Sequence, residues 1–180
     1  LSYTTIGNEK PTGICGSGLV DLIALLVRHG VIDETGCFDD FSEHPLAQKL
    51  DDDRFYLTDS IWLSQKDVRQ FQLAKAAIHA GITTLCTSAG LSPRDVRKLY
   101  IAGGLGFYLR EESALTAGLI PGDFSGRIQA LGNSALAGAL RCLESRERER
   151  ACSIAEAAQI CELNGRADFT QNFVDAMSFE

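Results

Sequence analysis

The stretch KLYIAGGLGFYL, residues 98–109, decides the fold class of this chain. Its apolar run Leu99–Ala102 predicts a buried strand, and two adjacent glycines, Gly103 and Gly104, end that strand. In an open α/β sheet, ligands gather at the carboxyl ends of the strands, and glycine lets a planar ring or a phosphate approach the backbone. The same residues also suit a tight turn with close helix packing, so the pattern alone leaves both interpretations open.

Composition limits the classes of protein to which the chain can belong. With 180 residues and 45% hydrophobic residues, it can bury the core of one domain or of one lobe. A net charge of −7 argues against a nucleic acid or an anionic membrane surface as the main partner. No apolar run approaches the ~20 residues of a membrane helix, and we expect a cytoplasmic protein. The six cysteines lack ligand spacing, so we expect no metal site from this chain alone.

Strands and helices alternate along the rest of the chain. We expect a fragment of a longer protein, because the sequence opens mid-pattern with LSYTTIG, which is typical of a strand. A hairpin is expected around residues 58–60, and a long helix follows, with Ser64 and Asp67 placed as a capping box. Further strands are expected at 99–102, 126–131 and 160–163, with helices at 17–30, 65–90, 110–120, 133–145, 146–159 and 168–179 and a shorter one from Pro93. This alternation predicts a layered α/β fold.

Three further segments could carry chemistry. On the long helix, Gln72, Lys75 and His79 share one face, which suits either a solvated polar stripe or a polar wall for a purine and ribose. The segment LGNSALAGAL, residues 131–140, combines a capping asparagine with a helical glycine, which usually reflects close helix packing. In GICGSG, residues 13–18, the glycines precede a helix, and we favour packing there over phosphate contact.

Taken in order, these segments resemble the C-terminal part of the reductive activators of corrinoid-dependent enzymes. The motifs PTGICGSGLVDLIALL, LSQKDVRQFQLAKAAIHAGI, LYIAGGLGFYL, AGLIP and LGNSALAGAL carry the resemblance, from about residue 6 to residue 179. These activators are iron–sulfur proteins in the actin, heat-shock chaperone and sugar-kinase superfamily of ATP-binding folds. The resemblance implies a ribonuclease-H-like lobe with a mixed sheet flanked by helices, here a single C-terminal lobe over residues 1–180.

The resemblance also implies an activity and its cofactors. Members use ATP, with magnesium, to drive an electron from an iron–sulfur cluster onto cob(II)amide, restoring cob(I)amide on a corrinoid protein or a corrinoid-dependent methyltransferase system. The [2Fe-2S] cluster would lie in a separate N-terminal domain. The residues that match nucleotide-binding positions are Ala102, Gly103, Gly104 and Gly106 of the adenosine motif, Gly132 and Asn133 before the second connecting helix, and Gln72 and Lys75 on the adenine and ribose side.

One departure from the superfamily pattern bears on catalysis. The two acidic D-x-G-T hairpins that grip the phosphates and magnesium do not occur in this sequence, so we expect no useful ATP hydrolysis and no catalytic residue in the chain alone.

Two alternatives to the activator function are the C-terminal lobe of a small-molecule kinase of the same superfamily and a non-catalytic nucleotide-sensing domain. A homodimer is an option that the sequence leaves open.

Overall fold

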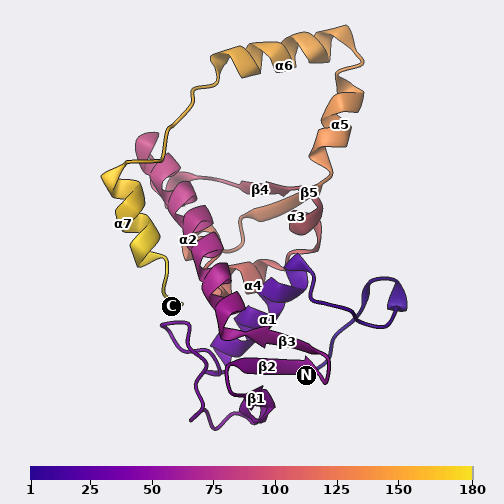
Figure 1. The fold of residues 1–180 in the computed structure, drawn as a ribbon. Coiled ribbons are helices and arrows are strands. Elements are labelled where there is room, and N and C mark those ends of the chain that lie inside the picture. Colours follow the sequence, from indigo (N-terminus) through magenta and orange to yellow (C-terminus); the bar gives the residue numbers. More distant parts are fainter. Residues whose placement is uncertain (180) are drawn as a thin grey trace.

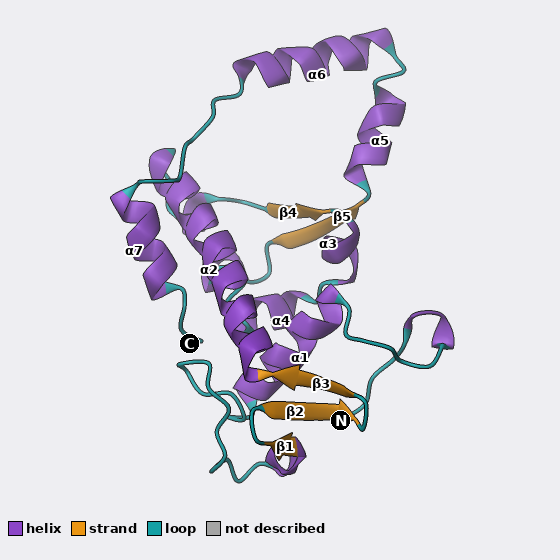
Figure 2. Cartoon of the chain, viewed as in Figure 1, coloured by secondary structure: helices purple, strands orange, loops and turns teal. Residues whose placement is uncertain are grey.

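A computed structural model of the chain describes residues 1–179. Figure 1 shows a body built around one long helix, with an arm of two helices extending away from it, and Figure 2 shows two separate sheets in that body. The short 3₁₀ turns are η1 (Ile6–Asn8), η2 (Pro45–Lys49), η3 (Pro93–Asp95) and η4 (Gly122–Phe124). No helix within the described residues is both long and apolar enough to cross a bilayer.

The first sheet is antiparallel and lies beside helix α1 (Gly16–Arg28). Its strands are β1 (Leu50–Asp51), β2 (Arg54–Thr58) and β3 (Ile61–Ser64), and the β2–β3 pair is the expected hairpin. Side chains alternate across it, since Phe55, Ile61 and Leu63 are buried against the core whereas Trp62 faces outward. This alternation fixes which face of the sheet packs on α1 and which face meets solvent.

Helix α2 (Gln65–Ser88) is the central element of the body. The expected capping box is confirmed: the Ser64 hydroxyl accepts from the Asp67 amide at 3.2 Å, and the Asp67 carboxylate accepts from the Ser64 amide at 2.9 Å. Val68 and Phe71 join α1, the hairpin and helix α4 (Glu111–Thr116) in one apolar core. The core therefore lies at the N-terminal half of α2.

The second sheet consists of two parallel strands, β4 (Leu99–Ala102) and β5 (Ile128–Gly132). Helix α3 (Gly104–Tyr108) follows β4 almost at once, which the sequence pattern did not predict, and helix α5 (Ser134–Arg141) follows β5. The parallel and antiparallel pairs thus lie in two sheets, and helices accompany both of them. Parallel strands are usually covered on both faces, yet Tyr100 and Leu131 are exposed.

Helices α5 and α6 (Ser145–Ala157) form the arm, and neither contains a buried residue. Helix α7 (Ala167–Asp175) brings the chain back along α2, where Asn172 donates to the Thr84 hydroxyl at 3.0 Å. Residues 176–179 then pass into the core, and Phe179 is fully enclosed. The last described residues are part of the packed body.

Two of the expected strands are wrong. The opening LSYTTIG segment is largely exposed and ends in a short 3₁₀ turn, and the positive φ angles of Gly7 and Asn8 there depart from an extended backbone. The segment 160–163 is irregular, and Ile160 is exposed. Within residues 1–179 no strand lies beside either segment, so neither backbone can form a ladder. The helix expected from Pro93 is shorter than predicted, a single 3₁₀ turn.

Candidate functional site

The carboxyl ends of β4 and β5 lie side by side because the two strands run parallel. Ala102 pairs with Gly132, and the Gly103 amide donates to the Gly132 carbonyl at 2.8 Å. Asn133 follows directly and caps α5, its Oδ1 accepting from the Leu136 amide at 3.0 Å. We call this set the glycine edge: Ala102, Gly103, Gly104, Gly132 and Asn133.

The glycine edge is open where a ligand would approach. Gly103 has φ of +96° and Gly132 has φ of +67°, so both adopt a backbone conformation that disfavours side chains. A Cβ added at Gly103 or Gly104 would meet no atom within 4 Å. A Cβ added at Gly132 would lie 3.5 Å from the ring of Phe107. The edge therefore leaves the backbone accessible to a planar group, with an exposed aromatic ring beside it.

Gly106 lies close to the glycine edge, but its surroundings differ. It is buried, and a Cβ there would overlap the side chain of Ile101. The absence of a side chain at Gly106 lets α3 pack directly onto β4. The structure thus explains this glycine by packing, whereas the space above Gly103 and Gly104 is unfilled.

Gln72 and Lys75 do not face the glycine edge. The Gln72 amide donates to the carbonyls of Met177 at 2.9 Å and Thr35 at 3.0 Å. The Lys75 ammonium donates to the Ser178 carbonyl and lies 4.6 Å from the centre of the Phe179 ring. Both side chains are almost fully enclosed. We call this set the C-terminal anchor: Gln72 and Lys75 together with residues 177–179.

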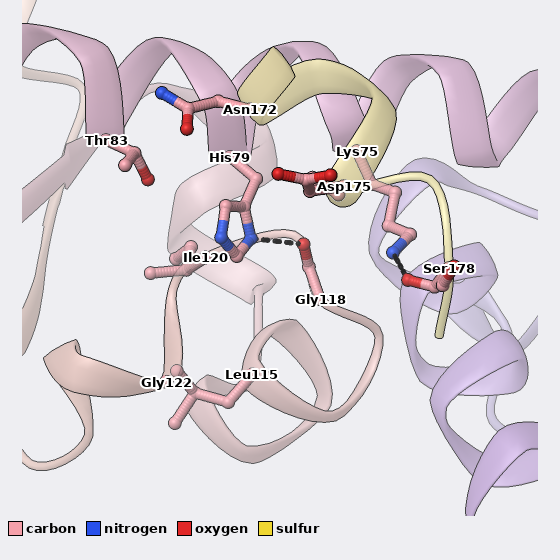
Figure 3. A pocket seen from close by; sticks show the side chains of 11 residues that line it. Lys75, His79, Thr83, Leu115, Gly118, Ile120, Gly122, Asn172, Asp175 and Ser178 are labelled. Carbon is pink, nitrogen blue, oxygen red and sulfur yellow. Dashed lines mark hydrogen bonds between the residues drawn. The ribbon is translucent and has the colours of Figure 1, made fainter. Parts of the chain in front are cut away.

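A cavity of about 380 Å³ lies beside the C-terminal anchor, between α2, α7 and the segment 115–122. Figure 3 shows Lys75 and His79 on its α2 wall, facing Asp175 and Asn172 of α7. His79 Nδ1 lies 3.1 Å from the Gly118 carbonyl, which makes this nitrogen the protonated one. The sequence did not indicate Gly118 or the C-terminal residues as neighbours of Lys75 and His79, since contacts between residues so far apart in the chain leave no local pattern.

The other charged and nucleophilic groups of the chain are dispersed. All six cysteines are free, and no group of three or more histidine, cysteine, aspartate or glutamate side chains in the described residues could hold a metal ion. Cys15 precedes α1, and a hydrogen bond with the Ser17 hydroxyl lowers the pKa of its thiol below the ordinary value.

Two parallel strands that end together at open glycines, each followed by a helix, define an α/β arrangement with an open edge at the carboxyl ends of its strands. A sequence model of the family described as the C-terminal domain of RACo, the ASKHA domain, matches residues 1–180, so the chain belongs to this family. The expected recognition and fold class are thereby confirmed.

Relatives whose names state a function support the same assignment. The corrinoid activation enzyme RamQ of Eubacterium limosum is 35% identical over 169 residues, which are 85% of this chain and 28% of that protein. A [Co(II) methylated amine-specific corrinoid protein] reductase of Methanosarcina barkeri is 28% identical over 71% of this chain and 21% of its own. A solved reductive activator for corrinoid, iron-sulfur protein superimposes with a TM-score of 0.85 at 33% identity, covering 99% of this chain and 30% of that one. The chain spans less than a third of the length of these relatives.

Proposed function

We propose that residues 1–180 form one C-terminal lobe of a longer ATP-dependent activator, which reduces cob(II)amide on a corrinoid protein to cob(I)amide. In this role the glycine edge supplies the adenosine side of a cleft whose phosphate side belongs to the rest of the protein. The observation that carries the proposal is the open backbone at Gly103 and Gly104, positioned next to Gly132 and Asn133 by the parallel strands.

The residues of the glycine edge fit an adenosine group. A purine ring needs a flat, accessible surface, and Gly103 and Gly104 leave one because nothing fills the space of their missing side chains. The Phe107 ring beside Gly132 adds apolar area. Nucleotide phosphates with magnesium would need acidic groups that this sequence does not present in the superfamily pattern, so their contacts are assigned to the other lobe.

The electron for cobalt must come from a reductant outside these residues, because the cysteines here do not gather into a cluster site. We assign the [2Fe-2S] cluster to a separate N-terminal domain. The task of this lobe is to bind and orient the nucleotide, so that closure of the two lobes favours the corrinoid-docked state. The proposed partner is a corrinoid protein, since the relatives are named for activating corrinoids or for reducing such a protein.

The test is a calorimetric titration of the chain with ADP and with ATP, magnesium present, comparing Gly104→Val with Gly122→Val. Both glycines have open space around the missing Cβ and neither has a positive φ, so both variants should fold. We expect weak binding that falls at least about tenfold in Gly104→Val only, since the new side chain occupies the approach to the backbone. Equal affinity in the two variants would contradict the placement of adenosine at the glycine edge.

A further inference from the structure

The negative charge of this protein is concentrated at one end. Residues 33–67 contain ten aspartates and glutamates and three lysines and arginines, a net charge of −7 that equals that of the whole chain. The other residues carry fourteen groups of each sign. Figure 1 places this segment at the lower end of the view, around the antiparallel sheet and away from α5 and α6. We call residues 33–67 the acidic end.

Several carboxylates of the acidic end are available to a partner. Within the described residues, no hydrogen bond or ion pair occupies the side chains of Glu34, Asp40, Glu43, Asp51, Asp52 or Asp59, and all six residues are exposed. Like charges held this close together repel one another, and a basic surface would relieve the repulsion. The charge of this end therefore suits association with a cationic face.

The outer face of the antiparallel sheet lies within the acidic end. Tyr56 pairs with Trp62 across β2 and β3, with ring centres 6.0 Å apart, and the Arg54 guanidinium lies 4.9 Å from the Trp62 ring centre. Trp62 remains 42% exposed although it is the only tryptophan of the chain. Tryptophan, tyrosine and arginine are the residue types that dominate the binding energy of protein interfaces.

A groove runs next to this face. It has a volume of about 340 Å³, and its walls come from the loop before α1 (Thr12, Ile14) and from the hairpin (Ile61, Trp62), with Asp67 at its border. A groove with an aromatic wall, of mixed polar and apolar lining, can receive an apolar side chain flanked by lysines or arginines. The groove shares Trp62 with the outer face of the sheet, and the exposed residues Asp52 and Asp59 belong to the turns at the two ends of β2.

We propose that this surface, the outer face of β2 and β3 with the carboxylates of the acidic end, docks the corrinoid protein through a lysine- and arginine-rich face of that partner. The inference rests on the proposed function for the identity of the partner, and it adds the place and the charge of the contact. The nucleotide site at the glycine edge belongs to the other sheet, so both ligands can be bound at once.

The probe is a purified methylated-amine-specific corrinoid protein in the Co(II) state, titrated with this chain at low and high salt. We expect binding that weakens about tenfold between 20 and 300 mM salt, because screening removes the charge attraction. Trp62→Ala should weaken it about 30-fold, the loss typical of an interface hot spot. The triple change Asp51→Asn, Asp52→Asn and Asp53→Asn should weaken it about tenfold and flatten the salt dependence. Asparagine is used because Asp52 has φ of +52°, which asparagine tolerates.

Matched controls lie outside the acidic end. Tyr100→Ala removes an exposed aromatic ring from β4, and the triple change Glu144→Gln, Glu149→Gln and Glu156→Gln removes three exposed charges from the arm. Both should bind within about twofold of the parent chain. Circular dichroism checks that every variant folds.

Each outcome decides the proposal. Corrinoid-protein binding that persists in Trp62→Ala and in the triple aspartate variant overturns the docking surface while leaving the partner in place. If the parent chain does not bind the corrinoid protein, both the docking surface and the choice of partner are overturned. A loss of nucleotide binding alone would contradict only the site at the glycine edge. Loss of self-association instead of corrinoid-protein binding in Trp62→Ala, measured by ultracentrifugation, would show that a second copy covers the face and would also overturn the proposal.

Discussion

The glycine edge and the glycines next to the C-terminal anchor lie in opposite surroundings. At the edge, Gly103 and Gly104 border empty space. Next to the anchor, a Cβ on Gly118 would lie 2.9 Å from Lys75 Nζ, so the Lys75 side chain takes up the space that a side chain at Gly118 would need. A glycine or a buried polar group therefore indicates a binding site only where the surrounding chain leaves the space unfilled.

The largest effect should come from the anchor. Lys75→Ala removes the hydrogen bond to the Ser178 carbonyl and leaves a void beside the Phe179 ring, so we expect a loss of about 3 kcal/mol in the free energy of unfolding. Urea denaturation measures this loss. The control is Leu73→Ala on the exposed side of the same helix, which should lose only about 0.5 kcal/mol, the usual size of a surface change. An unchanged unfolding free energy together with lost nucleotide affinity would move Lys75 into the nucleotide site.

A smaller effect should separate backbone strain from crowding at the anchor. Gly36 and Gly90 both have positive φ, but a Cβ on Gly36 would overlap the Gln72 amide, whereas one on Gly90 would meet nothing within 4 Å. We expect Gly90→Ala to cost about 1 kcal/mol from strain alone. Gly36→Ala should cost about 2 kcal/mol in total, because Gln72 must also move. Equal losses by thermal or urea unfolding would mean that Gln72 is not tightly held.

The sequence predicted the strand that leads to the glycine edge better than the contacts of the anchor, because a strand pattern is local. The strand Leu99–Ala102 has the predicted boundaries, and the Ser64 capping box depends on residues only three apart. Parallel pairing of β4 with β5 then places Gly132 next to Gly103, because the carboxyl ends of parallel strands lie at the same edge of a sheet.

The contacts of the anchor could not be predicted from the sequence in this way. Gln72 and Lys75 look like a solvated stripe, since spacing along a helix does not reveal that residues 177–179, about a hundred positions away, cover that face. The two wrong strands have the same origin, because strand propensity does not supply a partner strand.

The smallest effect concerns the first turn of α7. Hydrogen bonds from the Arg166 guanidinium lower the pKa of Asp168 to about 2, from an ordinary value of 3.8. A carboxylate with a lowered pKa in the folded state stabilises the fold above pH 3.8, and that stabilisation disappears as the pH falls toward 2. We expect Asp168→Asn to lower Tm slightly at pH 7 and not at all near pH 2. A difference in Tm that is constant across this range would show that the carboxylate charge is not involved.

The most direct test of the contrast between the two regions is a titration of the ¹⁵N-labelled chain with millimolar ADP and magnesium, followed by amide chemical shifts. We expect shifts that saturate at Gly103, Gly104, Gly132 and Asn133, the residues with an open or exposed backbone. The amides of Gln72 and Lys75 should stay unchanged, since both side chains are enclosed and are hydrogen-bonded to the C-terminal residues. Saturating shifts around Lys75 and Gly118 with none at the glycine edge would contradict the proposed site.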